Sequence, residues 1–419
     1  MVNQELHQYP KTGPRFFYGY IVVAAAFIIQ MLMFGPRVSF GVFFKPMLTE
    51  FGWTRALISG AISISSIMQG FFGIIMGGLN DRLGPRTVLT LCGFLIGLGY
   101  LLMSLTSAAW QLYLFYAVII GIGMGGILAP PMSTVARWFV KRRSVMTGIV
   151  VAGGGIGGII MPPVANWLIS TYGWRKSYII IGALVLVIII LASQFLRRDP
   201  TKMGQEPYGG NRVGEQRLDL NTEGLSLKEV TYTRQFWMAV TMLSCFGFCI
   251  ATILLHIVPH ATDIGISAAI AANILATIGG AAPISGIVLG GVADRIGNRQ
   301  AYIICFILMS AALFWLLTAS EVWMLYLFAV VIGLGAGGGT TLMSPLTAEL
   351  FGIRSHGLIF GVCLFCQTTA GAIGTFIAGY IFDVTGSYQL IFLVCAAFAV
   401  IGLILASILR PIKTLEVKI

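Results

Sequence analysis

The segment GGLNDRLGPR at residues 77–86 recurs as GGVADRIGNR at residues 290–299, and this repetition decides how the chain is organised. Asp294 of the second copy corresponds to Asp81 of the first, and the difference between the two numbers defines a repeat offset. Three further pairs keep the same offset: LYLF at 112–115 and 325–328, Gly148 and Gly361, and Gly173 and Gly386. Four matches in one register indicate that the chain consists of two copies of one folding unit.

The composition places both copies in a membrane. Of the 419 residues, 57% are hydrophobic and only 10% are charged, whereas a soluble protein carries about 25% charged residues. The mean hydropathy of +0.91 excludes a water-soluble enzyme, a nucleic-acid-binding protein and a disordered chain. Since a helix needs roughly 20 apolar residues to cross the hydrocarbon, we predict an all-α polytopic membrane protein with twelve transmembrane helices. The apolar runs lie at about residues 17–44, 54–78, 87–107, 110–136, 144–170, 176–196, 235–261, 267–292, 300–319, 322–348, 356–383 and 387–409.

One long polar stretch divides the twelve spans into six and six. We therefore predict an N-terminal six-helix bundle over residues 1–196, a cytoplasmic central loop over residues 197–234 and a C-terminal six-helix bundle over residues 235–419. Two repeats of this kind are typical of secondary transporters, in which the substrate site lies near the midplane between the halves.

The net charge of +11 indicates orientation in the membrane rather than an acidic partner such as nucleic acid. Lys and Arg concentrate in cytoplasmic loops. With the N-terminus inside, 21 of the 26 basic residues fall on the cytoplasmic side, four fall outside and Arg37 lies within a span. We expect a multi-pass protein of the cell (inner) membrane with both termini in the cytoplasm, and we expect a single chain to be the working unit.

The cysteines do not suggest a metal centre. All seven lie inside the predicted spans: Cys92, Cys245, Cys249, Cys305, Cys363, Cys366 and Cys395. The Cys363-x-x-Cys366 pair has no partner ligands in its helix, so we interpret these thiols as small packing residues. The sequence predicts neither a metal nor a cofactor.

The repeated segment also carries a family resemblance. Residues 77–86, with their copy at 290–299, resemble the signature loop of the major facilitator superfamily, and twelve spans around a central loop agree with it. Within that superfamily, RWFVKRR at 137–143 and AGGG at 152–155 resemble the monocarboxylate transporters of the lactate and pyruvate type and their bacterial oxalate/formate relatives. The resemblance implies the two-bundle fold of the superfamily and transport by alternating access.

Charged residues of the repeated segment stand at the ends of the second and eighth spans. The resemblance implies a gate whose charges bridge neighbouring helix ends in one state and separate in the other. The alternative is an ordinary stabilising interaction of an acid with a helix N-terminus. The predicted gating residues are Asp81, Arg82, Arg86, Asp294, Arg295 and Arg299.

Arg37 lies inside the first span, roughly 10 Å outward from its centre at about 1.5 Å per residue. A charge there is costly and normally faces a cavity or a partner. Because a guanidinium offers a planar, bidentate match to a carboxylate, we predict that Arg37 binds the carboxylate of a substrate. The alternative is that its side chain reaches the external interface past Pro36. The resemblance favours binding, since a first-span lysine near this position engages the substrate or the proton in monocarboxylate transporters.

His256 and His260 lie four residues apart, on one face of the seventh predicted span. An ordinary pKa of about 6.5 suits them to proton carriage. Every Asp and Glu lies in a loop, in a tail or at a span end, so no acid in the membrane core competes for this role. We predict that these histidines bind the proton or substrate oxygens, with Arg37 as a third proton-coupling candidate. The alternative is that both are satisfied core residues.

The sequence departs from the patterns of the resembling families at two places, and these differences narrow the class of substrate. The Asp-x-x-x-Arg pair of the animal monocarboxylate transporters is missing, because the corresponding positions hold Ile278 and Ala282. The two basic residues of the oxalate/formate antiporters are missing as well, since those positions hold Ala282 and Gln367. One embedded cation would leave a dianion under-compensated, so we predict a monoanion.

Other polar residues of the spans are weaker candidates. Tyr116, Asn273, Gln367 and Tyr380 are predicted to line the cavity, with interhelical hydrogen bonding as the alternative, whereas Gln30, Gln69 and Asn166 are interpreted as packing groups. Together the sequence predicts a secondary transporter of small monocarboxylates such as lactate or pyruvate, coupled to protons. The alternatives are an organic anion exchanger of the oxalate/formate type and a non-transporting membrane sensor of a carboxylate.

Overall fold

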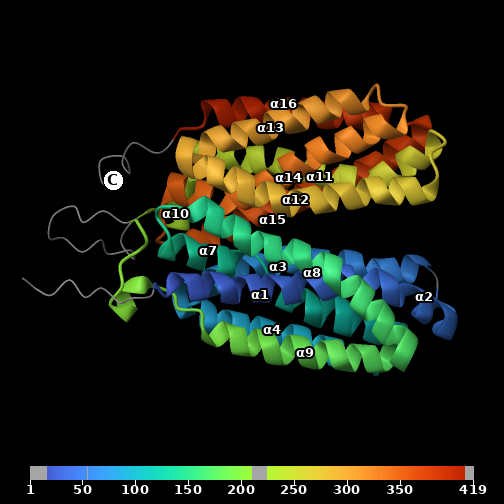
Figure 1. The fold of residues 1–419 in the computed structure, drawn as a ribbon, viewed down its shortest axis with the longest axis horizontal. Coiled ribbons are helices and arrows are strands. Elements are labelled where there is room, and N and C mark those ends of the chain that lie inside the picture. The colour runs from blue at the N-terminus through green and yellow to red at the C-terminus, as the bar shows by residue number, and fades with distance from the viewer. Residues whose placement is uncertain (1–16, 54, 210–223, 411–419) are drawn as a thin grey trace, which may run out of the picture.

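The computed structural model describes residues 17–53, 55–209 and 224–410. Within these ranges the regular structure is helical apart from two isolated β-bridges, and twelve segments are long and apolar enough to cross a membrane. The predicted all-α polytopic fold is therefore confirmed. Figure 1 shows the helices as two bundles that lie side by side, with the described chain ends and the linker at one end.

The helices divide as follows. The first bundle contains α1 (Gly19–Val38), α2 (Phe40–Phe51), α3 (Arg55–Leu83), α4 (Pro85–Met103), α5 (Ala109–Leu112), the π-helix η1 (Tyr113–Ile120), α6 (Gly121–Met124), α7 (Ala129–Trp138), α8 (Arg143–Tyr172) and α9 (Trp174–Gln194). The linker contains the 3-10 helix η2 (Pro200–Met203) and α10 (Leu227–Thr231). The second bundle contains α11 (Arg234–Asp263), α12 (Ala268–Ile296), α13 (Asn298–Leu316), α14 (Val322–Phe351), α15 (His356–Thr385) and α16 (Gln389–Ile408).

The helix boundaries repeat with the offset of the sequence motif. Helices α12, α13 and α15 begin and end at the counterparts of the first and last residues of α3, α4 and α8. Helix α14 stands in the same relation to the fourth span, which runs from Ala109 to Trp138 through α5, η1, α6 and α7. The two bundles are therefore two copies of one six-helix unit, and any residue can be compared with its counterpart at the repeat offset.

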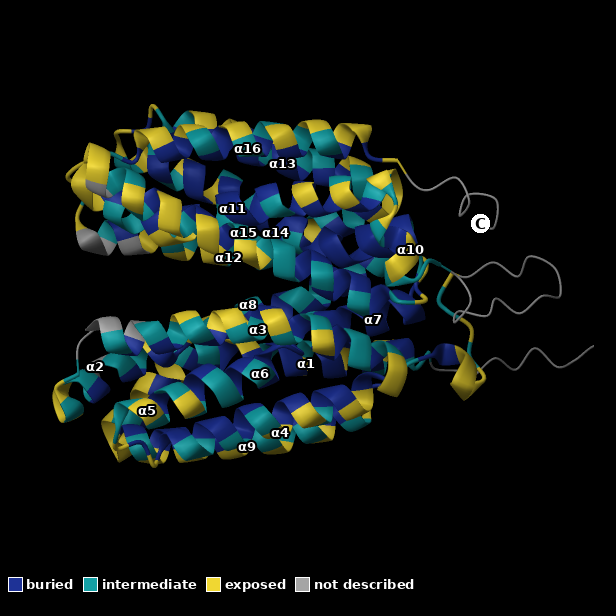
Figure 2. Ribbon diagram, turned by 180° about the vertical axis from the view of Figure 1, so that it is seen from behind, coloured by how far each residue is buried: buried dark blue, intermediate teal, exposed yellow. Residues whose placement is uncertain are grey.

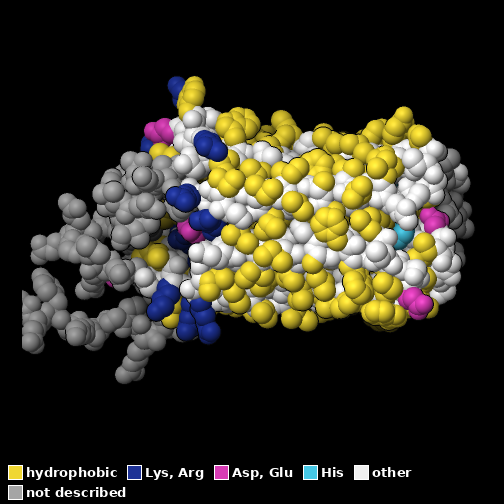
Figure 3. All heavy atoms as spheres, turned by 90° about the horizontal axis from the view of Figure 1, so that it is seen from above, with side chains coloured by type: hydrophobic (Ala, Val, Ile, Leu, Met, Phe, Trp, Pro, Cys, Tyr) yellow, Lys and Arg dark blue, Asp and Glu magenta, His cyan; other side chains and the backbone are white. Residues whose placement is uncertain are grey.

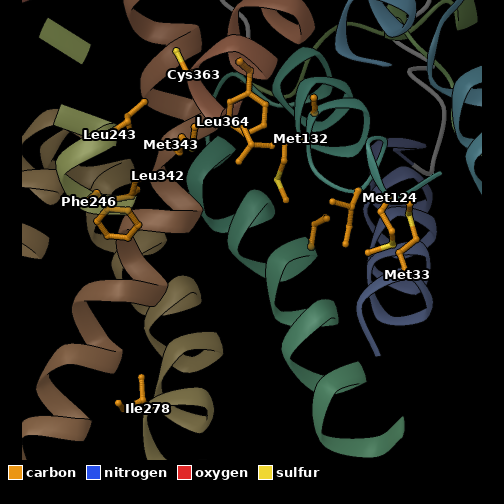
Figure 4. Packing of buried hydrophobic residues seen from close by; sticks show 14 of the residues in the cluster. Met33, Met124, Met132, Leu243, Phe246, Ile278, Leu342, Met343, Cys363 and Leu364 are labelled. Carbon is orange, nitrogen blue, oxygen red and sulfur yellow. The ribbon is translucent and has the colours of Figure 1, made fainter. Parts of the chain in front are cut away.

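Apolar side chains fill the interior of both bundles and also cover the outside. Met33, Met124 and Met132 are packed in the first bundle, and Phe246 and Leu342 in the second (Figure 4). Large apolar residues also remain exposed along the outward faces of the helices (Figure 2). An apolar exterior is expected where lipid rather than water is the solvent.

On the surface of this apolar body, charged side chains lie near the ends. Figure 3 shows Lys and Arg gathered at the end where the described chain begins and ends, and a band without charged side chains across the middle of the face that it presents. We call this end, which contains Asp81, Arg137 and Arg299, the basic end, and the other the opposite end.

Glycines bring the two bundles into contact over the half nearer the basic end. A Cβ on Gly290 would lie 2.6 Å from the carbonyl oxygen of Ser144, and a Cβ on Gly361 would lie 2.9 Å from that of Gly73. No side chain fits in such gaps, so glycine is required for this approach of α12 to α8 and of α15 to α3.

The contact between the bundles reaches a common level on both sides. Gly70 of α3 faces Thr368 of α15, with 3.2 Å between the position of a Cβ and Oγ1, and Gly155 of α8 faces Pro283 of α12. Gly70 and Pro283 are counterparts in the repeat, as are Gly155 and Thr368. Further toward the opposite end, Gly279 and Gly280 of α12 and Gly379 of α15 have open space beside them. The bundles thus meet from the basic end to this level and part beyond it.

The two ends of the linker are fastened at equivalent places. Tyr208 forms a β-bridge with Phe139, in the loop after α7, and Gly224 forms one with Gly352, in the loop after α14. Phe139 and Gly352 are counterparts in the repeat, so each bundle holds one end of the linker against the same loop.

Candidate functional site

Arg37, near the end of α1, is held by polar residues of α3. Its Nη1 donates a hydrogen bond to the Oε1 of Gln69, and its Nη2 donates one of 2.9 Å to the Oγ of Ser66. Ser66 in turn donates to the carbonyl oxygen of Ile62, at 3.0 Å. The sequence identified Arg37, but Gln69 had been interpreted as a packing group and Ser66 had not been singled out. These two hydrogen bonds link the end of α1 to the middle of α3.

The charge of Arg37 is not neutralised by an acid. No Asp or Glu within residues 17–53, 55–209 and 224–410 forms an ion pair with it. The hydroxyls of Tyr116 and Tyr100 lie near enough to interact with it electrostatically. The Tyr100 hydroxyl is buried and has no hydrogen-bond partner among the described residues. A guanidinium has five N–H donors, so Arg37 retains donors for an anion after binding Gln69 and Ser66.

Tyr116 belongs to the π-helix η1, which interrupts the fourth span. Short π-helical segments inside membrane helices are often found at functional sites, because the extra residue turns side chains into new directions. Tyr116 is 1% exposed and its ring packs on Phe40 of α2, with 4.2 Å between ring centres. The structure therefore places Tyr116 inside the first bundle, behind Arg37.

Arg37 and its partners lie at the level where the two bundles part. Gln69 precedes Gly70, the glycine of α3 that faces Thr368 of the other bundle. Ser66, one helical turn toward the opposite end, is exposed, and Gln69 and Arg37 are half-buried. The group therefore lies in the first bundle near mid-span rather than at either membrane surface, and whether Arg37 faces a cavity stays a prediction.

His256 and His260 share one face of α11, as their spacing predicts, and both rings pack against Tyr388. The Nε2 of His256 is 3.1 Å from the carbonyl oxygen of Thr375, and its Nδ1 is 3.4 Å from the Tyr388 hydroxyl. The Nε2 of His260 is buried without a partner in the part of the chain that the structure describes, and its ring meets Phe392 edge-on. Both histidines thus face α15 and α16, in the bundle that does not contain Arg37.

The structure does not bring the remaining candidates to Arg37. Asn273 on α12 is exposed, and Tyr380 on α15 is 65% exposed. Gln367 is half-buried, and its Oε1 lacks a partner among the described residues. Its side chain lies against Gly247 of α11, within the second bundle. Contact of these three residues with a substrate stays a prediction.

Asp81, at the end of α3, caps a helix of the other bundle. Its carboxylate accepts hydrogen bonds from the backbone N–H groups of Gly357 (3.1 Å) and Leu358 (2.9 Å), in the first turn of α15. Helix α15 has no side-chain cap from its own N-cap residue, Ser355. The N-terminus of a helix carries partial positive charge, so the carboxylate satisfies free donors and holds the two bundles together.

Asp294, at the end of α12, makes the matching contact in the reverse direction. It accepts hydrogen bonds from the backbone N–H groups of Ser144 (3.0 Å) and Val145 (3.1 Å), in the first turn of α8. All three residues are the counterparts, at the repeat offset, of those in the other contact. Asp81 and Asp294 therefore form a reciprocal pair of caps across the interface, which we call the gate.

Arg137 strengthens one side of the gate only. It is 1% exposed, and its guanidinium lies 3.2 Å from Asp199 of the linker and 3.9 Å from Asp81. It also donates a hydrogen bond of 2.7 Å to the carbonyl oxygen of Ile353, in the other bundle. The counterpart of Arg137 is Leu350, so the second side lacks this network. The sequence marked residues 137–143 as a family feature without assigning this contact, which depends on three distant segments.

The other predicted gating residues make contacts within their own bundle or are exposed. Arg86 donates to the Oε1 of Gln194 on α9, at 2.5 Å, and Arg299 donates to the carbonyl oxygen of Ala406 on α16, at 3.2 Å. Arg82 and Arg295 are exposed. In this conformation the aspartates alone of these six residues cap a helix of the other bundle, and a gating role stays a prediction for all six.

At the opposite end, Glu50 of α2 is tied to α9. Arg175 forms an ion pair with it, and the Nε1 of Trp174 donates a hydrogen bond of 2.6 Å. The hydrogen bond from Arg175 lowers the pKa of Glu50 below its ordinary value. Both partners of the ion pair are about two-fifths exposed, so the pair contributes little free energy. It joins two elements of one bundle and does not bridge the interface.

Known proteins resemble the chain over nearly its whole length. A family model described as Major Facilitator Superfamily matches residues 26–288 and 253–418. The chain is 28% identical to monocarboxylate transporter 13 of Rattus norvegicus, with 92% of this chain and 87% of the relative covered. It is 26% identical to monocarboxylate transporter 2 of Homo sapiens, with 91% and 83% covered. Among solved structures, the proton:xylose symporter XylE bound to 6-bromo-6-deoxy-D-glucose superposes with a TM-score of 0.77 at 16% identity, covering 96% of this chain and 99% of that one.

Proposed function

Because the chain belongs to the major facilitator superfamily, it is a multi-pass membrane transporter and not an enzyme, and we propose that it carries small monocarboxylates of the lactate and pyruvate type in symport with a proton. We further propose that it resides in the cell (inner) membrane with the basic end in the cytoplasm. The charge distribution of the loops supports this orientation.

The observation that carries the substrate assignment is Arg37. It is a cation near the level where the bundles part, held by neutral groups and not paired with an acid in the described part of the chain. A monocarboxylate supplies one negative charge and two oxygens that a guanidinium can bind side by side. The names of the relatives, monocarboxylate transporters 13 and 2, support the same substrate class.

The gate supplies the conformational part of the mechanism. In the structure the bundles touch from the basic end to mid-span and part beyond it, so a substrate at Arg37 would enter from the opposite end. Release at the basic end requires that the caps made by Asp81 and Asp294 open together with the glycine contacts. Alternating access then consists of breaking these contacts and closing the opposite end over the substrate.

Two routes for the proton follow from the side chains present. His260 has a buried ring nitrogen without a partner among the described residues, which leaves it able to accept a proton, whereas both ring nitrogens of His256 have neighbours. Alternatively, Arg37 binds the anion and the accompanying proton together as the neutral acid. We assign the proton to His260 first, because an imidazole can both accept and release a proton and its Nε2 has no partner among the described residues.

Uptake of labelled L-lactate into proteoliposomes tests the function directly. We expect accumulation that increases with an inward proton gradient and disappears when Arg37→Ala is substituted. Uptake that depends only on an internal counter-anion would replace symport by exchange. Binding without uptake under any gradient would refute transport and leave a carboxylate sensor.

A further inference from the structure

The partners of Arg37 are unusual because they are neutral acceptors. Gln69 offers a carbonyl oxygen and Ser66 a hydroxyl oxygen, and neither carries charge. A buried cation is normally compensated by an acid. Here the guanidinium is positioned by two hydrogen bonds while its charge stays available.

The second bundle shows that this polarity is not needed for folding. The counterparts of Arg37, Ser66 and Gln69 at the repeat offset are Ile250, Gly279 and Ala282. Helix α12 nevertheless begins and ends at the counterparts of the first and last residues of α3, the helix that carries Ser66 and Gln69. Since the same six-helix unit forms with apolar residues at all three positions, the polar group in the first bundle is a functional addition.

We propose that Gln69 and Ser66 are part of the substrate-binding site, where they hold the guanidinium of Arg37 in the empty transporter and give it up to the incoming carboxylate. This inference rests on the proposed role of Arg37 as the carboxylate-binding residue. Gln69 is the positioning residue that matters most, because it is half-buried beside the level where the bundles part, whereas Ser66 is exposed.

The exchange is favourable because the carboxylate brings a charge that the amide lacks. The hydrogen bond from Arg37 to Gln69 has one ionised partner, whereas a bound carboxylate adds Coulomb attraction between opposite charges. A carboxylate that replaces the Gln69 carbonyl therefore gains more than the protein loses, and the released amide can form hydrogen bonds with the substrate or with water. A glutamate at position 69 would remove this advantage, since it would neutralise Arg37 from within the protein.

Substitutions at position 69 separate this role from a structural one. We would measure L-lactate and pyruvate binding to the purified full-length protein by titration calorimetry between pH 5 and pH 8, with thermal stability of each variant as a folding check. Gln69→Glu is expected to weaken binding roughly tenfold or more at pH 7.5, because an ion pair to Arg37 competes with the ligand. The loss should persist across this pH range, because the ion pair to Arg37 keeps the new carboxyl ionised.

Gln69→Met is the matched neutral variant of similar size. It removes the carbonyl that positions Arg37 but adds no charge, so binding should weaken by less than in Gln69→Glu. Equal losses of affinity in Gln69→Glu and Gln69→Met would refute the proposal that the substrate carboxylate replaces Gln69 at Arg37. Wild-type affinity in Gln69→Glu at every pH would refute it as well. Arg37→Ala separates the test of Arg37 from the test of Gln69. Retained binding in that variant refutes the proposal that Arg37 binds the carboxylate. Lost binding in Arg37→Ala together with unchanged Gln69→Glu refutes only the assignment of Gln69.

Discussion

Replacing Asp81 by asparagine removes the negative charge from one cap of the gate while leaving one acceptor in place. The carboxylate now serves two backbone donors of α15, at 3.1 and 2.9 Å, and lies 3.9 Å from Arg137. An acid at a partly buried helix N-terminus contributes up to about 2 kcal/mol, and one hydrogen bond about 1 kcal/mol. We expect Asp81→Asn to destabilise the closed gate by about 1–2 kcal/mol, which shifts the equilibrium roughly 5- to 30-fold toward opening.

Hydrogen exchange measured by mass spectrometry reports the shift of the opening equilibrium at the helix end where the cap is broken. Exchange of a peptide that covers the first turn of α15 should accelerate by the same factor as the opening equilibrium. Asp294→Asn should instead accelerate exchange in the first turn of α8, by a smaller factor, because Asp294 is exposed and lacks the equivalent of Arg137. L-Lactate affinity should change by no more than about twofold, and the transport rate should fall.

Glu229→Gln is the matched control for this experiment. Glu229 lies at the basic end as well, but it accepts a hydrogen bond of 2.6 Å from the N–H of Ser226 within its own segment and does not bridge the bundles. It should leave exchange in α8 and α15 unchanged. Equal exchange of the first turn of α15 in Asp81→Asn and the wild type would refute the cap as a gate contact. A large loss of lactate affinity without faster exchange would instead place Asp81 in the binding site.

Three further predictions concern other parts of the molecule. Arg137→Met should lower the free energy of unfolding in detergent by about 1–3 kcal/mol, because the buried Asp199 then keeps only Arg198, at 3.6 Å, as an ion-pair partner; a change below about 1 kcal/mol would contradict the network. Glu50→Gln should lower thermal stability slightly at pH 7, by well under about 1 kcal/mol, because Arg175 lowers the pKa of Glu50. That contribution is present above the unfolded-state pKa of about 4.3 and is lost as the pH falls through the folded one, so wild type and variant should converge near pH 3. His260→Gln should abolish the stimulation of lactate uptake by an inward proton gradient, whereas unchanged stimulation would leave the proton to Arg37.

The sequence was sufficient to predict the fold because its signals are redundant. Twelve apolar runs, one polar linker and a motif repeated at a constant offset all indicate the same two-bundle architecture, and the helix boundaries follow that offset. Arg37 was predictable as well, since a charge in the hydrocarbon is rare enough to be informative without a structure. Asp81 and Asp294 were identified by their motif.

The partners of these residues were not predictable, for a physical reason. Gln69 is one of several polar residues in the spans, and its contact with Arg37 depends on how far α1 is shifted and rotated against α3. The donors that Asp81 binds are backbone N–H groups of Gly357 and Leu358. Since nearly every residue has such a group, the residue types at these positions do not indicate the contact. Arg137 joins segments that are 62 and 216 residues away. Such contacts are properties of the packing and not of any local pattern.

The reciprocal caps have the form of an isologous interface, in which residue i meets residue j and j meets i across a two-fold axis. A single six-helix unit with Asp81 and the first turn of α8 carries both complementary surfaces, so two identical copies would satisfy each other through the same hydrogen bonds. Position 37 breaks this two-fold relation, because its counterpart in the second bundle is Ile250. The contacts between the bundles therefore keep the symmetry of the repeat, whereas the polar group around Arg37 belongs to one bundle alone.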